Sequence, residues 1–333
     1  MKKHDVKYEF HSVFAHSISD YLTFKESLGE KTISPGNILR QFDRYCSSID
    51  LDKECLTNDL IGSWLLTYPN DKKTTHSNRI SVLRGFAKYL STVNEDETWQ
   101  PIKKFGGSNN KYVPYIYSFD EIKRIISVAD TLTKSFGNSR MNEIFPAIIR
   151  MLYCCGLRLG EALSLKLKDV DLENGILIIR GAKFGKDRKI PISDSLLLYL
   201  RKYCARNKDF IGIDSNNYFF PTSRGEQYSH SAIYEVFRTV LWNANISHQG
   251  KGKGPRLHDF RHTFAVHSLK KSAEQGEEIY SVLTRLMVYL GHEKITSTEY
   301  YLCLTADVFP DVLKNSDKIC SRAIPKVTYY EKE

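Results

Sequence analysis

Apolar residues recur at helical spacing through the first third of the chain. Between residues 17 and 90 they return every three or four positions, which places them on one face of a helix. Representative positions are Ile18, Tyr21, Leu22, Phe24, Ile80, Leu83, Phe86 and Leu90. Turn-forming segments at residues 34–37 and 68–73 interrupt the pattern. The pattern predicts a small helical domain of about four helices, in the size range of a bundle.

A change of composition marks a linker after this region. Residues 99–115 combine proline, a Gly-Gly-Ser-Asn-Asn run and lysines with few apolar positions, so they bury little surface. Helical patterns resume beyond it. Ser118 is the expected cap of one helix, and another apolar helix at residues 144–153 is expected to end at Gly156.

The period then changes from helix to strand. Residues 175–180 and 189–193 are short β-branched runs on either side of a basic loop, which predicts a hairpin. Helical spacing returns from Ser195. We therefore expect a mainly α fold with a small antiparallel β-hairpin or sheet, divided into a helical domain at residues 1–98, a linker at 99–115, a second domain at 116–315 and a tail at 316–333.

Charge and cysteine content narrow the choice of partner. The 333 residues carry a formal net charge of +9, and fixed positive charge attracts phosphates, so nucleic acid is the first expected partner. An anionic membrane is the second. The N-terminus has no apolar signal region, and no stretch approaches the about 20 apolar residues that span a membrane. Seven cysteines without a C-x-x-C pair favour free thiols. We expect a soluble, cytoplasmic protein with no membrane partner.

Four segments carry residues suited to phosphodiester chemistry without a metal. Such chemistry needs cations to neutralise charge on the non-bridging oxygens, an acid for the leaving oxygen and an aligned nucleophile. The first segment contains Arg158, which follows a glycine turn between helices and whose planar fork suits two phosphate oxygens. A lone arginine in such a place is more often a solvated charge or an ion-pair partner.

The second segment is His258-Asp-Phe-Arg261-His262. His258 and Arg261 are three positions apart, so both are able to reach one phosphate from the same helical face. An ordinary amphipathic helix is the alternative. The spacing of His258 and His262 also suits helical metal ligands, but Arg261 would crowd such a site with like charge and no third ligand is evident. We expect neither a metal nor another cofactor.

The third and fourth segments supply an acid and a nucleophile. A lysine at the basic hairpin tip acts as an acid when neighbouring cations lower its pKa. Charged hairpin tips are more often turns that only add solubility. The fourth segment places His292 ahead of Tyr300 and Tyr301. A phenol is a good phosphodiester nucleophile beside cations, but single tyrosines are more often packed aromatic residues.

In this order and spacing, the four segments resemble the catalytic domain of tyrosine recombinases, the phage integrase family, over about residues 115–310. The first arginine box of the family resembles residues 156–161, and the histidine-x-x-arginine box resembles residues 258–265. The final box resembles Leu290-Gly-His292 with a tyrosine nine positions later, which selects Tyr301 over Tyr300. The expected second domain is therefore a catalytic domain.

The resemblance implies a role for each residue. Arg158 and Arg261 would clamp the scissile phosphate, while His258 handles a proton and His292 helps to bind the transition state. The supporting residues would be Glu161 and His262. The hairpin reads Gly181-Ala-Lys183-Phe-Gly-Lys186, where the family usually has Gly-Lys-Gly. Counting back from Pro191 favours Lys183 as the acid, and Lys186 is the alternative.

The helical domain resembles the core-binding domain of these enzymes, which helps to close around DNA. Arg79 and Arg84 on its last predicted helix are candidate DNA contacts, and an ordinary solvated helix face is an equal alternative. Lys186 and Arg188 of the hairpin are further candidates.

The mechanism implied by the resemblance is strand exchange without ATP or metal. Tyr301 would attack the scissile phosphate to form a 3′-phosphotyrosyl bond while Lys183 protonates the departing 5′-oxygen. A 5′-hydroxyl from a partner duplex would then reverse the step. Exchange between two duplexes implies double-stranded DNA as partner and four protomers on it. The residues after Tyr301 resemble a mobile-element integrase or transposase subgroup; the target sequence and any accessory proteins stay open.

Three other functions share part of this pattern. A type IB topoisomerase would use nearly the same residues to relax DNA. An accessory protein would bind DNA without chemistry, but binding alone needs no phenol beside two arginines. A metal-dependent nuclease would need paired carboxylates near the histidines, and the motifs contain none.

Overall fold

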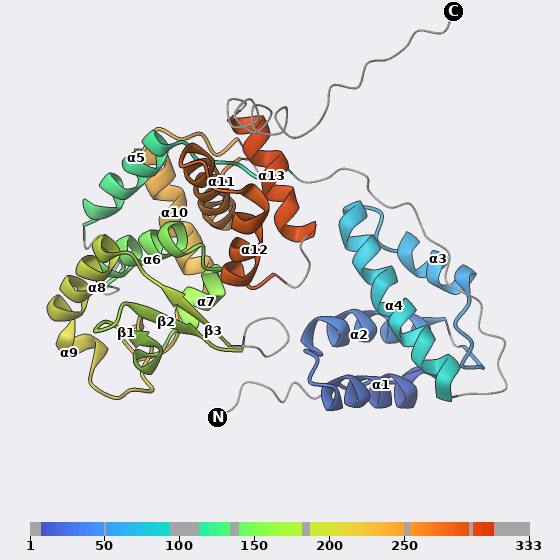
Figure 1. The fold of residues 1–333 in the computed structure, drawn as a ribbon. Helices are drawn as coiled ribbons and strands as arrows, with labels where there is room; N and C mark the ends of the chain where they lie inside the picture. The colour runs from blue at the N-terminus through green and yellow to red at the C-terminus, as the bar shows by residue number, and fades with distance from the viewer. Residues whose placement is uncertain are drawn as a thin grey trace, which may run out of the picture. The chain divides into compact units, whose positions relative to one another are not determined.

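The computed structural model describes residues 8–49, 51–93, 113–133, 140–181, 187–249, 254–292 and 296–309. The chain divides into two compact units, which we call the N-terminal unit (residues 1–112) and the C-terminal unit (residues 113–333) (Figure 1). Residues 99–112 of the predicted linker and the tail at 316–333 lie outside the described residues, whereas residues 113–115 of the linker are described. The exact limits of the linker and the tail therefore stay predictions.

In its described part, the N-terminal unit consists of the helices α1 (Ala15–Ser27), α2 (Ile33–Ser48), α3 (Asn58–Leu66) and α4 (Lys73–Val93). Their apolar faces enclose a core rich in aromatic side chains. The Phe42 and Trp64 rings meet edge to face with centroids 5.2 Å apart, and Phe14 and Phe86 are fully buried beside them. Burial of aromatic rings on this scale is enough to hold a small bundle together.

One of the two predicted turns in this unit is wrong. Residues 34–37, Ser-Pro-Gly-Asn, form the first turn of α2 instead of a connection between helices. Proline is tolerated there because the first turn of a helix needs no N–H donor. Gly36 is also explained, since the Tyr8 ring packs where its Cβ would be. The other predicted turn, residues 68–73, connects α3 to α4, although its last residue, Lys73, already begins α4.

The C-terminal unit is helical around one small sheet, so the predicted fold class is confirmed. The sheet is antiparallel, in the order β1 (Val170–Asp171), β2 (Ile176–Ile179) and β3 (Arg188–Pro191), with Leu177 opposite Ile190. The other elements of this unit are α5 (Phe119–Asp130), α6 (Met141–Cys155), α7 (Leu159–Ser164), the 3-10 helix η1 (Leu167–Asp169), α8 (Asp194–Arg206), α9 (Lys208–Ile211), α10 (His230–Asn243), α11 (Asp259–Glu274), α12 (Ile279–Leu290) and α13 (Thr296–Val308).

The buried helix α6 organises this unit. It packs against α5, α8 and α11, and it ends at Gly156 in the left-handed conformation, with φ of 58°. Helix α5 begins with the expected cap, since Ser118 and Glu121 form a reciprocal capping box. Helices α11, α12 and α13 lie against one another around a second apolar cluster that includes Leu269, Leu283 and Leu290 (Figure 1). The ends of α6 and α12 thereby reach the same side of α11.

Candidate active site

Arg158 stands at the start of α7, just after the turn that ends α6. The turn needs a glycine, because a Cβ on Gly156 would come within 2.5 Å of the Phe264 ring. The backbone N–H of Arg158 donates to Glu161 Oε2 at 2.9 Å, and its Nη1 donates to Oε1 at 2.8 Å. With its side chain 34% exposed, Arg158 offers part of its guanidinium to a ligand.

Arg261 is buried on α11 and is held mainly by backbone carbonyls. Its residue exposure is 1%, and its Nη1 and Nη2 donate to the carbonyl oxygens of Gly156 and Leu290 at 2.8 and 2.6 Å. The Glu161 carboxylate lies 4.0 Å away. Burial, and next the neighbouring charge of Arg158, lower the pKa of Arg261 to about 10. The site therefore holds more positive charge than it neutralises.

His292 follows the left-handed Gly291 at the end of α12 and is tied to two neighbours. Arg261 Nη2 donates to its Nε2 over 3.1 Å, and its Nδ1 is 3.0 Å from the Thr298 hydroxyl. Because arginine only donates, Nε2 accepts and Nδ1 carries the proton of a neutral ring. Burial, then Arg261 and Arg158, lower the pKa of His292 to about 4.

Tyr301 on α13 lies beside these cations. Its ring stacks near His292 with centroids 5.8 Å apart, and its residue exposure is 3%. Burial raises the pKa of Tyr301, while the charge of Arg261, a hydrogen bond from Arg261 and the charge of Arg158 act to lower it. Tyr300 next to it is only half-buried. The structure therefore places Tyr301 beside the arginines, with its side chain almost completely buried.

His258 and His262 complete the cluster from the first turn of α11. Their rings meet edge to face at 4.9 Å, and His262 is also 5.5 Å from the Tyr301 ring. Burial and neighbouring positive charge lower the pKa of His258 to about 4 and that of His262 to about 3. Although the surrounding protein desolvates its ring, His258 keeps much of its surface exposed, whereas the Nδ1 of His262 is buried without a hydrogen-bond partner among the described residues.

Arg188 does not fit the DNA-contact role that the sequence suggested. Its side chain is only 10% exposed, and its Nη1 and Nη2 donate to the two oxygens of Glu161 at 3.1 and 2.8 Å. Its Nε donates to the Tyr289 carbonyl at 3.1 Å. The alternation of a strand already put Arg188 on the face of buried Ile190, which is the sequence feature that indicates this inward position.

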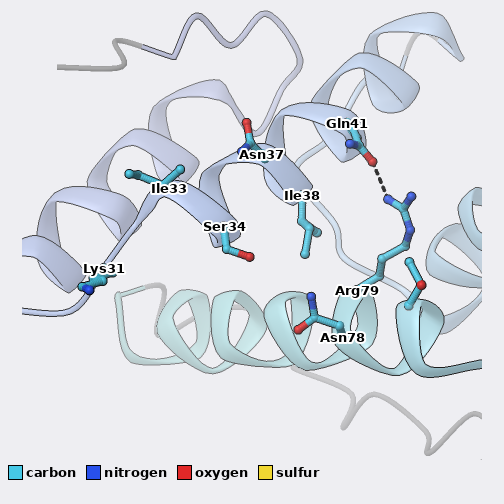
Figure 2. A pocket seen from close by; sticks show the side chains of 9 residues that line it. Lys31, Ile33, Ser34, Asn37, Ile38, Gln41, Asn78 and Arg79 are labelled. Carbon is cyan, nitrogen blue, oxygen red and sulfur yellow. Dashed lines mark hydrogen bonds between the residues drawn. The ribbon is translucent and has the colours of Figure 1, made fainter. Parts of the chain in front are cut away.

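The role suggested for Arg79 meets the same difficulty in the N-terminal unit. Its residue exposure is 7%, its Nε donates to Asp71 at 3.0 Å, and its guanidinium lies 3.8 Å from the Tyr68 ring centroid. Figure 2 shows it reaching from α4 to Gln41 on α2, at one end of a pocket of about 500 Å³. Arg79 is thus occupied within its own unit, whereas Arg84 is half-buried and its DNA contact stays a prediction.

The sequence left one role in this site open and missed one of its residues. Lys183 and Lys186 lie outside the described residues, so the choice of acid stays a prediction. Thr298, which orients His292, was missed, because a hydroxyl three positions before a tyrosine has no distinguishing pattern.

Among the described residues, no group of three or more histidines, cysteines and acidic residues is arranged to hold a metal ion. No helix in the same part of the chain has the length and apolarity to cross a membrane.

Comparison with known proteins decides the family. The phage integrase family model matches residues 117–307. The chain belongs to this family. It is 26% identical over 309 residues to the putative integrase/recombinase y4rB of Sinorhizobium fredii, covering 92% of this chain and 98% of that protein. It is also 32% identical over 211 residues to the tyrosine recombinase XerA of Pyrococcus horikoshii, covering 63% of this chain and 64% of XerA. The chain is accordingly an enzyme of the tyrosine recombinase type.

Solved structures share the fold of this integrase family member. The XerH site-specific recombinase bound to palindromic difH substrate matches with a TM-score of 0.62 and 18% identity, covering 83% of this chain and 77% of XerH. The Tn1549 transposon integrase in complex with transposon right end DNA also has a TM-score of 0.62, with 16% identity, covering 86% of this chain and 94% of the other. At these identities the likeness establishes the fold.

Proposed function

We propose that this chain is a site-specific DNA recombinase that cleaves and rejoins DNA through a 3′-phosphotyrosyl bond to Tyr301. The observation that carries the proposal is the approach of Tyr301 to Arg261 and His292, three residues from separate helices or helix ends. A phenol beside a buried arginine whose nearby carboxylate, Glu161, is shared with two other arginines is suited to an incoming phosphate, since the phosphate supplies the missing negative charge.

The electrostatics of the cluster favour a bound phosphate. Glu161 is the shared acidic partner of Arg158, Arg188 and Arg261, so positive charge is in excess. Burial, and next this excess of positive charge, lower the pKa values of His258 and His292. A scissile phosphate would offset the excess positive charge, and Arg158 would bind the phosphate more strongly for that reason. The added negative charge would also let the imidazoles accept a proton as charge develops in the transition state.

In the proposed reaction, the Tyr301 oxygen attacks phosphorus in line, the new P–O bond joins it to the 3′ end, and the bond from phosphorus to the 5′-oxygen breaks. The phenol proton passes to the neutral imidazole of His258, and Lys183 protonates the 5′-oxygen. Attack by a 5′-hydroxyl of another duplex reverses these transfers, so ATP and metal are not needed. Because Tyr301 is covered, the step requires α13 to shift against α11 when DNA binds.

The proposed partner is double-stranded DNA, in keeping with the net charge of +9 and with the DNA complexes of the XerH and Tn1549 proteins. The domain at residues 1–98 would bind DNA beside the catalytic domain at residues 116–315. Strand exchange cuts two duplexes twice each, so we propose that four protomers assemble on the DNA. We also propose that the chain is a soluble enzyme of a mobile element and that it meets its DNA substrate in the cytoplasm.

The proposal is tested by capturing the covalent intermediate. The purified protein is incubated with sheared genomic DNA of its source organism in EDTA, protein-bound fragments are recovered after denaturation, and their ends are sequenced. Nicked duplexes that carry the recovered site then serve as suicide substrates. Wild type and Tyr300→Phe are expected to form the adduct and Tyr301→Phe to form none.

Three outcomes would contradict the proposal. Absence of any wild-type adduct would favour a DNA-binding accessory protein. An adduct that persists in Tyr301→Phe would move the nucleophile elsewhere. Relaxation of a supercoiled plasmid that lacks the recovered site, without exchange between two site-bearing duplexes, would identify a type IB topoisomerase.

A further inference from the structure

The Arg188 side chain forms a closed arrangement with Glu161. The Glu161 oxygen Oε1 accepts from the Nη1 atoms of Arg158 and Arg188, and Oε2 accepts from the Arg158 backbone and from Arg188 Nη2. Although burial acts to raise the pKa of Glu161, these contacts, with the Arg188 hydrogen bond first among them, lower it to about 2. Glu161 is therefore a fixed anion that holds Arg158 from one side and Arg188 from the other.

The same side chain also holds the end of α12. Arg188 Nε donates to the carbonyl of Tyr289, and Arg261 donates to the next carbonyl, that of Leu290. A Cβ on the following Gly291 would lie 3.3 Å from Arg188 Cδ, so this residue packs directly against the turn before His292. Arg188 thus connects strand β3 to both places from which the phosphate-binding groups project.

We propose that Arg188 is a positioning residue for DNA cleavage, acting through Glu161 on Arg158 and through the end of α12 on His292. This inference rests on the proposed function. Each Arg188 nitrogen donates to the protein, so the residue orders the site and does not itself grip DNA. The guanidinium fork is essential, because a lysine keeps the charge but cannot bridge two carboxylate oxygens and a carbonyl.

The test compares Arg188→Lys with Lys189→Gln on the suicide substrate described above. Lys189 is exposed on the same strand, so its change removes a surface charge next to Arg188 in the chain without touching Glu161. In Arg188→Lys, the rate of adduct formation in the saturated complex is expected to fall about 10²-fold, the cost of misplacing reacting groups by about 1 Å. DNA affinity and its dependence on salt should stay those of wild type. Lys189→Gln should cleave at the wild-type rate.

A double-mutant cycle separates positioning from loss of stability. Arg188→Lys, Glu161→Gln and the double variant are assayed at a temperature where circular dichroism shows each to be folded. If Arg188 acts through Glu161, adding Arg188→Lys to Glu161→Gln should slow cleavage much less than it does in wild type. Fully additive effects, or a wild-type rate in saturated Arg188→Lys, would overturn the inference.

A DNA contact at Arg188 would give a different result. The salt slope of binding would then drop by about one in Arg188→Gln, which removes the charge, while cleavage of bound DNA stayed unchanged, and this outcome would also overturn the positioning role. Failure of wild type to form any adduct would instead contradict the proposed function. The two ideas are therefore distinguished by the wild-type arm alone.

Discussion

Arg79 in the N-terminal unit and Arg261 in the C-terminal unit are both buried, but their partners differ. Arg79 donates to the Asp71 carboxylate at 3.0 Å and lies over the Tyr68 and Trp64 rings. Arg261 is bonded to two carbonyls and a neutral imidazole, and Arg158 adds repulsion. Arg79 has a carboxylate of its own, whereas Arg261 is held mainly by dipoles and shares the more distant Glu161 with Arg158 and Arg188.

This difference separates a structural arginine from a candidate ligand-binding one. Burying a charge is costly unless an opposite charge accompanies it, so a fold that leaves Arg261 in excess positive charge gives up stability. An incoming phosphate recovers that free energy at the point where negative charge grows during cleavage. The character of the partners, and not burial itself, distinguishes the two residues.

The largest expected effect comes from removing each arginine in turn. Arg261→Met should slow adduct formation by about 10³–10⁵-fold, as loss of an arginine that stabilises phosphoryl transfer does. Arg79→Met should leave cleavage of bound DNA unchanged, yet destabilise the N-terminal unit by about 1–3 kcal/mol because Asp71 loses its partner. Single-turnover kinetics and hydrogen exchange resolved by unit measure the two effects. Equal losses of cleavage in both variants would refute the distinction.

Acid should weaken the C-terminal unit selectively. The pKa values of His258 and His292 are lowered to about 4 and that of His262 to about 3, whereas an unfolded histidine titrates near 6.5. The unfolded chain therefore binds more protons below about pH 6.5, and the stability that these residues contribute above it is lost as the pH falls towards 4. Asp259, with a pKa raised to about 6, opposes this trend as a single group.

Hydrogen exchange of the free protein between pH 7 and pH 5 measures this loss, with the N-terminal unit as internal reference. Replacing His292 with glutamine should reduce the pH dependence, since one depressed imidazole is gone. Bound DNA should reduce it as well, because phosphate favours the protonated rings. A C-terminal unit that becomes more stable on acidification would contradict the picture of an under-neutralised site.

The smallest expected effect is stabilisation by inorganic phosphate. At about ten times its dissociation constant, phosphate should stabilise the C-terminal unit by about 1.4 kcal/mol relative to chloride of equal ionic strength. The N-terminal unit should not respond, because Arg79 already has its anion. Differential scanning calorimetry of wild type and Arg158→Gln provides the measurement. A gain that survives in Arg158→Gln would place the binding outside the candidate site.

Much of the architecture was predictable because it follows from local pattern. The capping box at Ser118, the end of α6 at Gly156 and the hairpin of β2 and β3 were all expected from short runs of sequence. Residues 34–37 misled because proline and glycine suit a first helical turn as well as a loop. Arg79 and Arg188 misled for another reason: a basic residue on an expected surface element gives no sign of the carboxylate that meets it.

The sequence by itself determined the helical and strand segments, which depend on neighbours a few positions apart. It also determined the excess of positive charge and the residue types that the chemistry needs, which follow from composition and order alone. The tertiary structure decided which of those residues meet. Arg188 reaches Glu161 from 27 positions away, and Arg261 reaches the carbonyl of Gly156 from 105 positions away. Such pairings depend on how α6, α11, α12 and β3 pack, and packing is a property of the whole core that no local pattern encodes.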